Sequence, residues 1–438
     1  MSTTLITNAT LVTLNAEGSI IPGGSVLIDG TTIAAAGMLD AVRADTVIDA
    51  GGRIVMPGLI NVHHHLYSTF ARGFAAPGEP ARNFQEILER LWWKLDRALQ
   101  PEDVYLSALL PMTEAIRAGC TTIIDHHASP SCADGSLDLI EKAFREAGLS
   151  GCLCYEVTDR NRPGEGIEEN IRFIRKCRAA MDPQITALFG LHASMTLGDA
   201  TLERCAAEGR ALGAGFHVHI DEAECDAKAS LRDFGARPVD RFARAGLLGP
   251  GSLLAHGIHL DDRGQKIIAE SGAMMATNPE SNMNNGLAVT PLLELLRLGV
   301  PVGLGTDGMS NTMIAQARAA YLIQRASRRD PRVAFVEACT MLLQHNRTIA
   351  GRVFPERRGR LAEGHLADVI ILDYTPFTPF DASTFLGHLL FGLVNAPVTT
   401  TIARGRVLMR DGVIPHLDET AIRRRAVERA RALWKRIA

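Results

Sequence analysis

Short apolar runs alternate with segments of helical periodicity from about residue 57 onward. Segments such as 101–118 and 202–212 carry apolar residues at helical spacing, and several end at a glycine, which adopts the left-handed conformation that follows many helices. Eight runs have the pattern of buried strands, at 58–62, 121–125, 151–157, 185–191, 215–220, 252–255, 273–277 and 301–305. Eight strands alternating with helices predict an α/β fold, a (β/α)8 TIM barrel.

The two ends of the chain have a different pattern, which is typical of antiparallel strands. Short apolar runs at 11–14, 26–28 and 47–48 are separated by the turn pairs Asp29-Gly30 and Gly51-Gly52. The same pattern returns at 368–372 and 398–409. We therefore expect one small β-sandwich formed from both ends. The predicted parts are 1–56 and 362–415 for the sandwich, 57–361 for the barrel, and 416–438 for a C-terminal surface helix.

Composition and charge exclude several classes of protein. The chain has 438 residues, 46% of them hydrophobic, and a formal net charge of −3. This composition excludes a disordered chain, and the lack of a basic block argues against a nucleic-acid or anionic-membrane partner. Residues 382–403 lack charged side chains but contain polar ones, so they predict a buried segment rather than a membrane span.

The cysteines and the first residues of the chain bear on its location. Eight cysteines without a C-x-x-C pair predict reduced, mostly buried thiols. The first sixteen residues contain no Lys or Arg, so the basic region of a secretory signal is not found there. Both features predict a cytoplasmic protein.

The chemistry of the chain is concentrated in its histidines, which gather at predicted strand ends. In a strand, alternate residues share a face, so the pairs His63/His65 and His217/His219 can each point into one site. His256 and Asp307 end two later runs. Because barrel enzymes collect catalytic groups at the C-terminal ends of their strands, three imidazoles and a carboxylate there suit Zn2+, Fe2+ or Mn2+. The alternative for a single H-x-H pair is a polar strand end with solvated histidines.

Several motifs together give the chain a family resemblance from about residue 5 to residue 415. They are 57–65 (PGLINVHHH), 219–222 (HIDE), Asn278-Pro279 with Ser281-Asn282, 304–308 (LGTDG) and 364–368 (GHLAD). The chain resembles the amidohydrolase superfamily, in the branch of cytosine, guanine and S-adenosylhomocysteine deaminases and triazine hydrolases. It is most similar to aminohydrolases associated with selenium-dependent purine metabolism. The stretch 125–127 (DHH) resembles 8-oxoguanine and isoxanthopterin deaminases.

The resemblance implies a ligand set for one divalent metal ion, with Zn2+ expected first. The implied ligands are His63, His65, His219 and Asp307. Binuclear relatives place a carboxylated lysine at the fourth strand, where this chain has His192 after Gly190-Leu191, and this difference favours a single metal. Family spacing selects His219 over His217 as the ligand, and a supporting role for His217 stays open.

The implied chemistry is hydrolysis by a metal-activated water. Asp307 would take the proton of this water, Glu222 would act as general acid and base toward the ring nitrogen and leaving group, and His256 would hydrogen-bond the developing charge. The expected substrate contacts are His192, Tyr67, Arg72 and His127. The alternatives are a packed histidine at 192 and ordinary loop contacts at 67 and 72, whereas His126 and His127 stay open between substrate contact and support.

We predict a hydrolytic deaminase of an amino-substituted N-heterocycle of purine, pterin, pyrimidine or triazine type. A second hypothesis keeps the same site but removes another group, by dechlorination, by desulfuration or by opening of a cyclic amide. A third, a metal-binding scaffold without catalysis, is disfavoured by Glu222 and His256, which a storage site does not need. The expected partners are a small heterocyclic substrate and further copies of the chain, as a homodimer or larger homo-oligomer.

Overall fold

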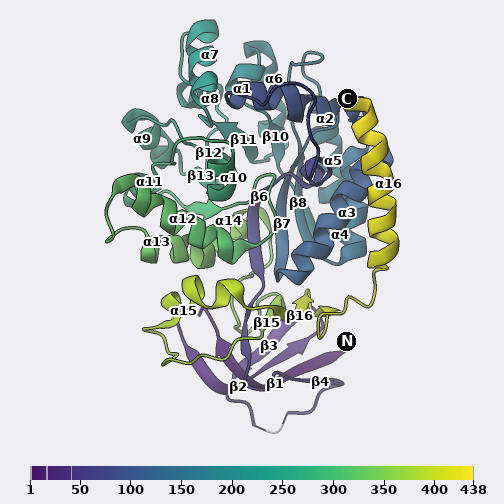
Figure 1. The fold of residues 1–438 in the computed structure, drawn as a ribbon, viewed down its shortest axis with the longest axis vertical. Coiled ribbons are helices and arrows are strands. Elements are labelled where there is room, and N and C mark those ends of the chain that lie inside the picture. Colours follow the sequence, from purple (N-terminus) through teal and green to yellow (C-terminus); the bar gives the residue numbers. More distant parts are fainter. Residues whose placement is uncertain (1, 16–17, 41, 438) are drawn as a thin grey trace.

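The computed structural model describes residues 2–15, 18–40 and 42–437. Two parallel sheets form its centre (Figure 1). The first contains, in order, β6 (Leu59–His64), β7 (Cys120–His127), β8 (Ser150–Tyr155) and β9 (Ile185–Ala187). The second contains β10 (Phe189–Leu191), β11 (Phe216–Ile220), β12 (Leu253–His256), β13 (Met274–Thr277) and β14 (Val302–Leu304). All eight predicted runs form strands, and the run 185–191 is divided between β9 and β10.

The two parallel sheets touch at both of their edges. A parallel bridge pairs His64, at the end of β6, with Asp307, just after β14. A second parallel bridge pairs Val157, just after β8, with Leu191 of β10. The backbone N–H of Thr306 also donates to the carbonyl oxygen of His63 at 2.9 Å. The first and last strands of the series therefore lie beside each other.

Helices follow the strands and lie outside the two sheets (Figure 1). In α4 (Ser136–Ala147), Leu137, Ile140 and Phe144 are buried, which is the i, i+3, i+7 spacing of one helix face. This helix ends at Gly148, whose φ of 82° is left-handed backbone. The other helices of this part are α1 (Phe84–Ile87), α2 (Trp93–Ala98), α3 (Pro101–Arg117), α5 (Ile167–Ala180), α6 (Asp199–Ala211), α7 (Glu224–Phe234), α8 (Pro238–Ala245), α9 (Asp262–Ser271), α10 (Pro279–Asn284), α11 (Leu292–Arg297), α12 (Met313–Arg328), α13 (Phe335–Thr340) and α14 (Asn346–Val353).

Both ends of the chain contribute strands to one eight-stranded mixed sheet (Figure 1, below the parallel sheets), in which some pairs are parallel although the sequence pattern is typical of antiparallel strands. Its strands are β1 (Thr3–Val12), β2 (Ile20–Asp29), β3 (Thr32–Gly37), β4 (Thr46–Asp49), β5 (Ile54–Pro57), β15 (Val369–Leu372), β16 (Val398–Ala403) and β17 (Arg406–Met409). β5 pairs antiparallel with β15, so that Met56 lies opposite Ile370. The sheet has its own apolar core, which includes Ile28 and Val55 from one chain end and Ile371 from the other.

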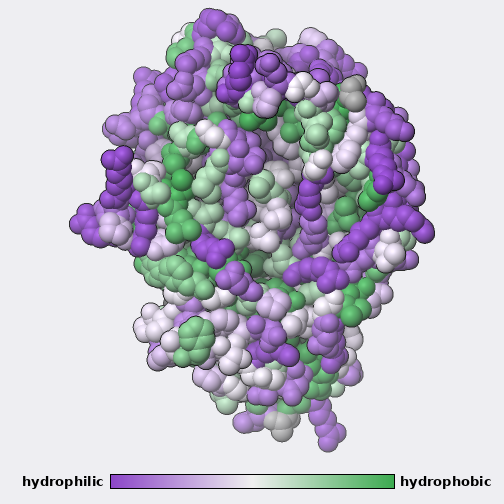
Figure 2. Space-filling view, viewed as in Figure 1, coloured by the Kyte–Doolittle hydropathy of each residue, from purple (hydrophilic) through white to green (hydrophobic). Residues whose placement is uncertain are grey.

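Two further helices lie in the C-terminal quarter. α15 (Phe385–Phe391) falls within the uncharged stretch 382–403, and no helix in the described ranges has the length and apolar character needed to cross a bilayer. α16 (Glu419–Ile437) lies along α3, where Arg429 donates to Asp103 at 2.7 Å. Hydrophilic residues cover the edge of the molecule where α16 lies (Figure 2), as expected for a surface helix.

Candidate metal and catalytic site

The site lies where the parallel strands end. His63 and His64 belong to β6, His219 to β11 and His256 to β12, and Asp307 follows β14. His64 points away from the other histidines, and its Nδ1 lies 2.9 Å from Oγ1 of Thr306. His256 and Asp307 have φ of 73° and 53°, a left-handed conformation that costs a non-glycine residue about 1 kcal/mol or more. Such strain at the ends of two strands of one sheet is typical of a functional site.

Four potential ligand atoms converge at the centre of this site. Nε2 of His65 lies 3.1 Å from Nε2 of His219 and 3.1 Å from Oδ1 of Asp307. Nε2 of His63 lies 3.6 Å from the same carboxylate oxygen and is buried without a hydrogen-bond partner in the described part of the chain. Two imidazole nitrogens that face one carboxylate oxygen, with the His219 nitrogen 3.1 Å from one of them, suit a divalent cation such as Zn2+.

The remaining ring nitrogens hold these three histidines in one tautomer. Nδ1 of His65 donates to the carbonyl oxygen of His126 at 2.6 Å, and Nδ1 of His219 donates to that of His192 at 2.9 Å. Nδ1 of His63 lies 2.9 Å from Nε2 of His217. With the proton on Nδ1, each Nε2 presents a lone pair to the centre, which is what a metal ion needs.

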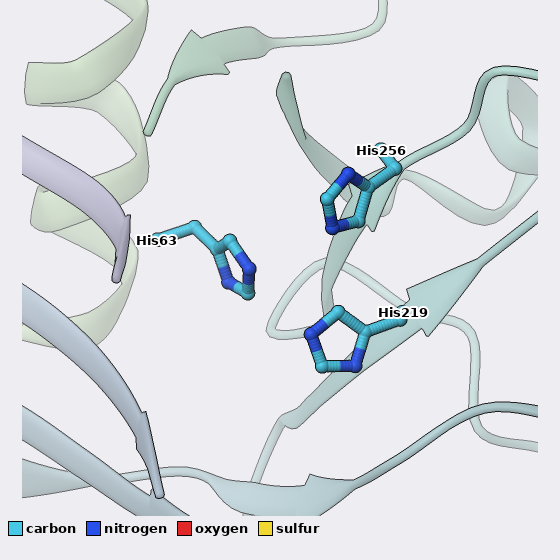
Figure 3. Close-up of side chains that lie close together, drawn as sticks. All are labelled: His63, His219 and His256. Carbon is cyan, nitrogen blue, oxygen red and sulfur yellow. The ribbon is translucent and has the colours of Figure 1, made fainter. Parts of the chain in front are cut away.

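His256 completes a second group beside this centre. The close-up shows the rings of His63, His219 and His256 turned toward one another (Figure 3), and a nitrogen from each lies within 4.8 Å of the other two. Nδ1 of His256 lies 3.0 Å from Oδ1 of Asn282, whereas its Nε2 lies 3.7 Å from Oε1 of Glu222. The structure therefore brings the predicted catalytic pair Glu222 and His256 together.

The two carboxyl groups of the predicted machinery have opposite environments. Burial raises the pKa of Glu222 well above its usual value, and the nearby Asp307 charge adds to this rise. Burial also opposes the ionisation of Asp307, but the imidazoles of His63, His65 and His256 around it outweigh burial and hold the pKa of Asp307 well below its usual value. The hydroxyl of Ser281 donates to Oδ2 of Asp307 at 2.6 Å. One carboxyl is thus suited to carry a proton and the other to stay charged.

A pocket opens onto these groups. Of the predicted substrate contacts, Tyr67 and His192 line it. Nδ1 of His192 lies 2.6 Å from Oγ1 of Thr196, which fixes the ring. The full lining is His65, Tyr67, Ser68, Phe84, Leu88, Trp92, Trp93, Asp96, Glu156, His192, His219, Glu222, Asn285, Asp307 and Gly308.

The structure does not bring Arg72 or His127 to this pocket. The side chain of Arg72 is 56% exposed and pairs with Glu114 at 2.7 Å. His127 is buried behind Tyr67, with ring centroids 5.7 Å apart, and its Nε2 lies 2.8 Å from Oγ of Ser129. Burial lowers the pKa of His127 to about 3, so this ring is neutral.

Several polar residues of the pocket were not among the site residues predicted from the sequence, and Trp93, Asp96 and Glu156 are three of them. Glu156 falls inside the apolar run 151–157, and an acidic residue near the end of such a run was the signal available for it. Trp93 and Asp96 belong to α2, whose helical pattern is equally typical of a surface or core helix.

Comparisons with known proteins agree with this geometry. The model of the family described as Amidohydrolase family matches residues 54–408. A 5'-deoxyadenosine deaminase of Methanosarcina mazei is 31% identical, over 100% of both chains. A 5-methylthioadenosine/S-adenosylhomocysteine deaminase of Moorella thermoacetica is 31% identical, over 96% of this chain and 97% of that protein.

Solved structures share the fold over nearly the whole length. An adenosine deaminase from Xanthomonas campestris with bound zinc superposes with a TM-score of 0.86, at 22% identity, over 99% of this chain and 98% of that one. The zinc complex of atrazine chlorohydrolase from Arthrobacter aurescens gives 0.84, at 20% identity, over 98% and 100%. The family match and the curated relatives confirm the predicted resemblance and enzyme class, a hydrolase of carbon–nitrogen bonds. The chain belongs to the amidohydrolase family.

Proposed function

We propose that this chain is a metal-dependent deaminase that releases ammonia from an amino-substituted N-heterocycle. The observation that carries the proposal is the position of Glu222, which lines the same pocket as His65, His219 and Asp307. A buried carboxyl of raised pKa, next to four converging metal ligands, can deliver a proton to a ring nitrogen at neutral pH. The deaminase names of the two curated relatives support the same reaction class.

We assign one divalent ion, Zn2+ first, to His63, His65, His219 and Asp307. The ligand atoms fit, because Nε2 of His63 and of His65 face one carboxylate oxygen of Asp307 and Nε2 of His219 lies 3.1 Å from that of His65. Nε2 of His63 is otherwise unpartnered among the described residues. When bound, such an ion lowers the pKa of a coordinated water toward neutrality and supplies the nucleophile. The bound zinc of the adenosine deaminase neighbour supports the choice of metal.

The residues of the chain then have distinct tasks. Asp307 is ionised and takes up the proton of the attacking water on its carboxylate. Glu222 carries its proton on a carboxyl oxygen and donates it to the ring nitrogen beside the reacting carbon. It then takes the remaining hydroxyl proton of the adduct and transfers it to the leaving amine, and as the C–N bond breaks and ammonia leaves, the proton on Asp307 passes to Glu222 and restores both groups. His256, held by Asn282, directs Nε2 toward Glu222 and toward the charge that develops at the reacting carbon.

A second candidate reaction keeps the same site and expels another group. The fold of the atrazine chlorohydrolase neighbour shows that this scaffold is compatible with dechlorination in that protein. The experiment is a product assay of the zinc-loaded enzyme with aminopurines, aminopterins, aminopyrimidines, chlorotriazines and thio-heterocycles. Release of ammonium supports the deaminase, whereas chloride or sulfide release without ammonium, or opening of a cyclic amide, supports the alternative.

We further propose how the chain is organised around this site. The bridges at both edges of the parallel sheets support one closed (β/α)8 barrel at 57–361. The separate apolar core supports a β-sandwich formed from 1–56 and 362–415, with the helix of 416–438 on the barrel. A homodimer or larger homo-oligomer in the cytoplasm stays part of the proposal, supported by the exposed apolar side chains Leu322, Val336, Phe377 and Phe391.

A further inference from the structure

One wall of the pocket is polar and is formed by Trp93, Asp96, Glu156 and His192. Behind it lies Arg160, whose Nη2 donates to Oδ2 of Asp96 at 2.8 Å and to Oε1 of Glu156 at 3.0 Å. The side chains of Asp96, Glu156 and Arg160 are 2%, 5% and 7% exposed. One buried guanidinium therefore donates hydrogen bonds to two buried carboxyl groups. The wall has more hydrogen-bond acceptor atoms than this guanidinium satisfies.

Several polar atoms of this wall have no partner in the described part of the chain. They are the acceptor Oδ1 of Asp96 and two donors, Nε1 of Trp93 and Nη1 of Arg160. Nδ1 of His126 is also unpartnered and lies 3.6 Å from Oε2 of Glu156. Because buried polar groups are normally hydrogen-bonded, unpaired atoms beside a pocket indicate that a ligand or ordered water completes them.

Glu156 stands close to the proposed metal ligands. Ligand atoms of Glu156, His192 and His219 all lie within 4.8 Å of one another. Glu222, His256 and Asp307 form a second group with the same spacing. Glu156 follows β8 and Glu222 follows β11, so the two carboxyl groups approach the pocket from different strands. A ring whose reacting carbon faces the metal ligands therefore meets a carboxyl group from two directions.

We propose, on the basis of the deaminase function above, that the substrate is a cyclic guanidine, with a reacting C–NH2 carbon between a bare ring nitrogen and a ring N–H. The 2-amino-4-oxo edge of a pyrimidine, purine or pterin has this arrangement. Glu222 donates to the bare nitrogen, and the ionised carboxylate of Glu156 accepts from the N–H. Asp96 and Trp93 complete the wall with one acceptor and one donor for the substituents beyond it.

The same wall disfavours two other classes of ligand. In a 6-aminopurine the reacting carbon lies between a ring nitrogen and a ring carbon, which offers no N–H to Glu156. A ligand with a carboxylate, such as S-adenosylhomocysteine, would bring a negative charge to a wall that already holds two carboxyl groups and one guanidinium. The proposal therefore separates this chain from the substrates named for its curated relatives.

The test compares two isomers of one composition, isocytosine and cytosine, because they differ in whether a ring N–H flanks the reacting carbon. Their affinities are measured by calorimetry on the zinc-loaded Glu222→Gln variant, and ammonium release is measured with the zinc-loaded wild-type enzyme. We expect isocytosine to bind at least about tenfold more tightly, the contribution of one hydrogen bond to a charged group. Guanine and adenine provide the same contrast in a larger ring.

A variant then assigns the preference to Glu156. We expect Glu156→Gln to weaken isocytosine binding by about tenfold or more, with cytosine binding and zinc content unchanged. Glu165→Gln is the matched control, because Glu165 is also buried but lies outside this pocket. If Glu156→Gln does not fold, the proposal is tested by the preference for isocytosine over cytosine in the protein with Glu156 intact.

The outcomes for the two proposals are distinct. Ammonium release from cytosine or adenine in preference to isocytosine and guanine overturns the present inference and leaves the deaminase function in place. Equal affinity for the isomers, or no affinity for either, also overturns it. Tight and selective isocytosine binding without ammonium from any substrate supports the recognition wall and overturns the deaminase function.

Discussion

Nε2 of His217 lies 2.9 Å from Nδ1 of His63, although the two residues belong to different sheets. For Nε2 of His63 to face a metal, its proton must be on Nδ1, so His63 donates to His217. His217 then carries its own proton on Nδ1, which lies 3.6 Å from Sγ of Cys154. The Cys154 thiol in turn donates to the carbonyl oxygen of Asp125 at 3.5 Å. A neutral imidazole, rather than a carboxylate, thus orients this proposed metal ligand.

Replacing His217 is expected to weaken metal binding rather than abolish folding. His217→Phe keeps an aromatic ring but removes the acceptor for His63, so we expect zinc affinity to fall by about 10- to 100-fold. Competition with a chromogenic chelator measures this directly. His217→Gln retains a hydrogen-bond acceptor, so its zinc affinity should lie between those of wild type and His217→Phe. If the Phe variant binds zinc as tightly as wild type, the hydrogen bond to His63 has no role in metal binding.

Loss of a direct ligand should have a larger effect on metal content. We expect purified His219→Asn to contain well under one zinc per chain. We also expect wild type treated with a chelator to unfold at a lower temperature than the zinc-loaded protein, because a ligand that binds only the folded state stabilises it. Elemental analysis and thermal unfolding provide the measurements. Adding zinc back should restore wild type but not the variant. Normal zinc content in His219→Asn would contradict the assigned ligand set.

The Glu222→Gln variant should separate catalysis from metal binding. Glutamine occupies nearly the same volume but cannot deliver a carboxyl proton, so we expect kcat to fall by about 100- to 10,000-fold. Zinc content and unfolding temperature should stay near those of wild type, since Glu222 is not an assigned ligand. Ammonium release at saturating substrate measures the change. Undiminished kcat would exclude Glu222 as the general acid.

Asp96 should make the protein less stable as pH rises through the weakly acidic range. Burial raises the pKa of Asp96 to about 6 in the folded state, against about 4 when unfolded. The folded state therefore holds this proton more tightly, and its stability falls between about pH 4 and pH 6, by at most about 3 kcal/mol. Asp96→Asn should remove this loss. Denaturant unfolding at pH 4 and pH 7 measures the free energy of unfolding of both proteins. The loss due to Asp96 is the fall between these two pH values in wild type minus the fall in Asp96→Asn.

Gly305 has no room for a methyl group. A Cβ at this position would lie 2.4 Å from Oδ1 of Asn278 and 2.7 Å from Cβ of His63. We expect Gly305→Ala to lower the free energy of unfolding by about 1–3 kcal/mol and to reduce zinc affinity by displacing His63. Gly351→Ala, in α14 with open space around it, is the control and should be neutral or slightly stabilising. Equal behaviour of the two variants would contradict this account of the site.

The order of the strands and the converging ligands could be predicted from the sequence because they depend on period and position. Residues at the carboxyl ends of parallel strands lie at one edge of the sheet, so the shared location of His219, His256 and Asp307 could be predicted from their places in the sequence. The motifs that contain these residues also resemble those of a known family, and the spacing of the family motif selected His219 over His217 as the expected ligand.

The pocket wall could not be predicted, because its partners are distant in the sequence. Arg72 is on the expected loop, yet Glu114 of α3 draws its guanidinium to the surface. Arg160, by contrast, binds both Glu156, four residues away, and Asp96, 64 residues away. Nothing in the local pattern distinguishes these two arginines. Which of the two guanidinium groups is buried depends on how α2 and α3 pack around β6, β7 and β8.

The pairing of β5 with β15 has a consequence for the order in which the protein can be built. β5 leads directly into β6, which carries His63, and the N–H of Gly58 between them donates to the carbonyl oxygen of Asp368 at 2.9 Å. During synthesis, β15 leaves the ribosome only after the whole series of parallel strands. The segment that leads into the strand of the proposed ligand His63 can therefore gain its pairing with β15 only when translation is nearly complete.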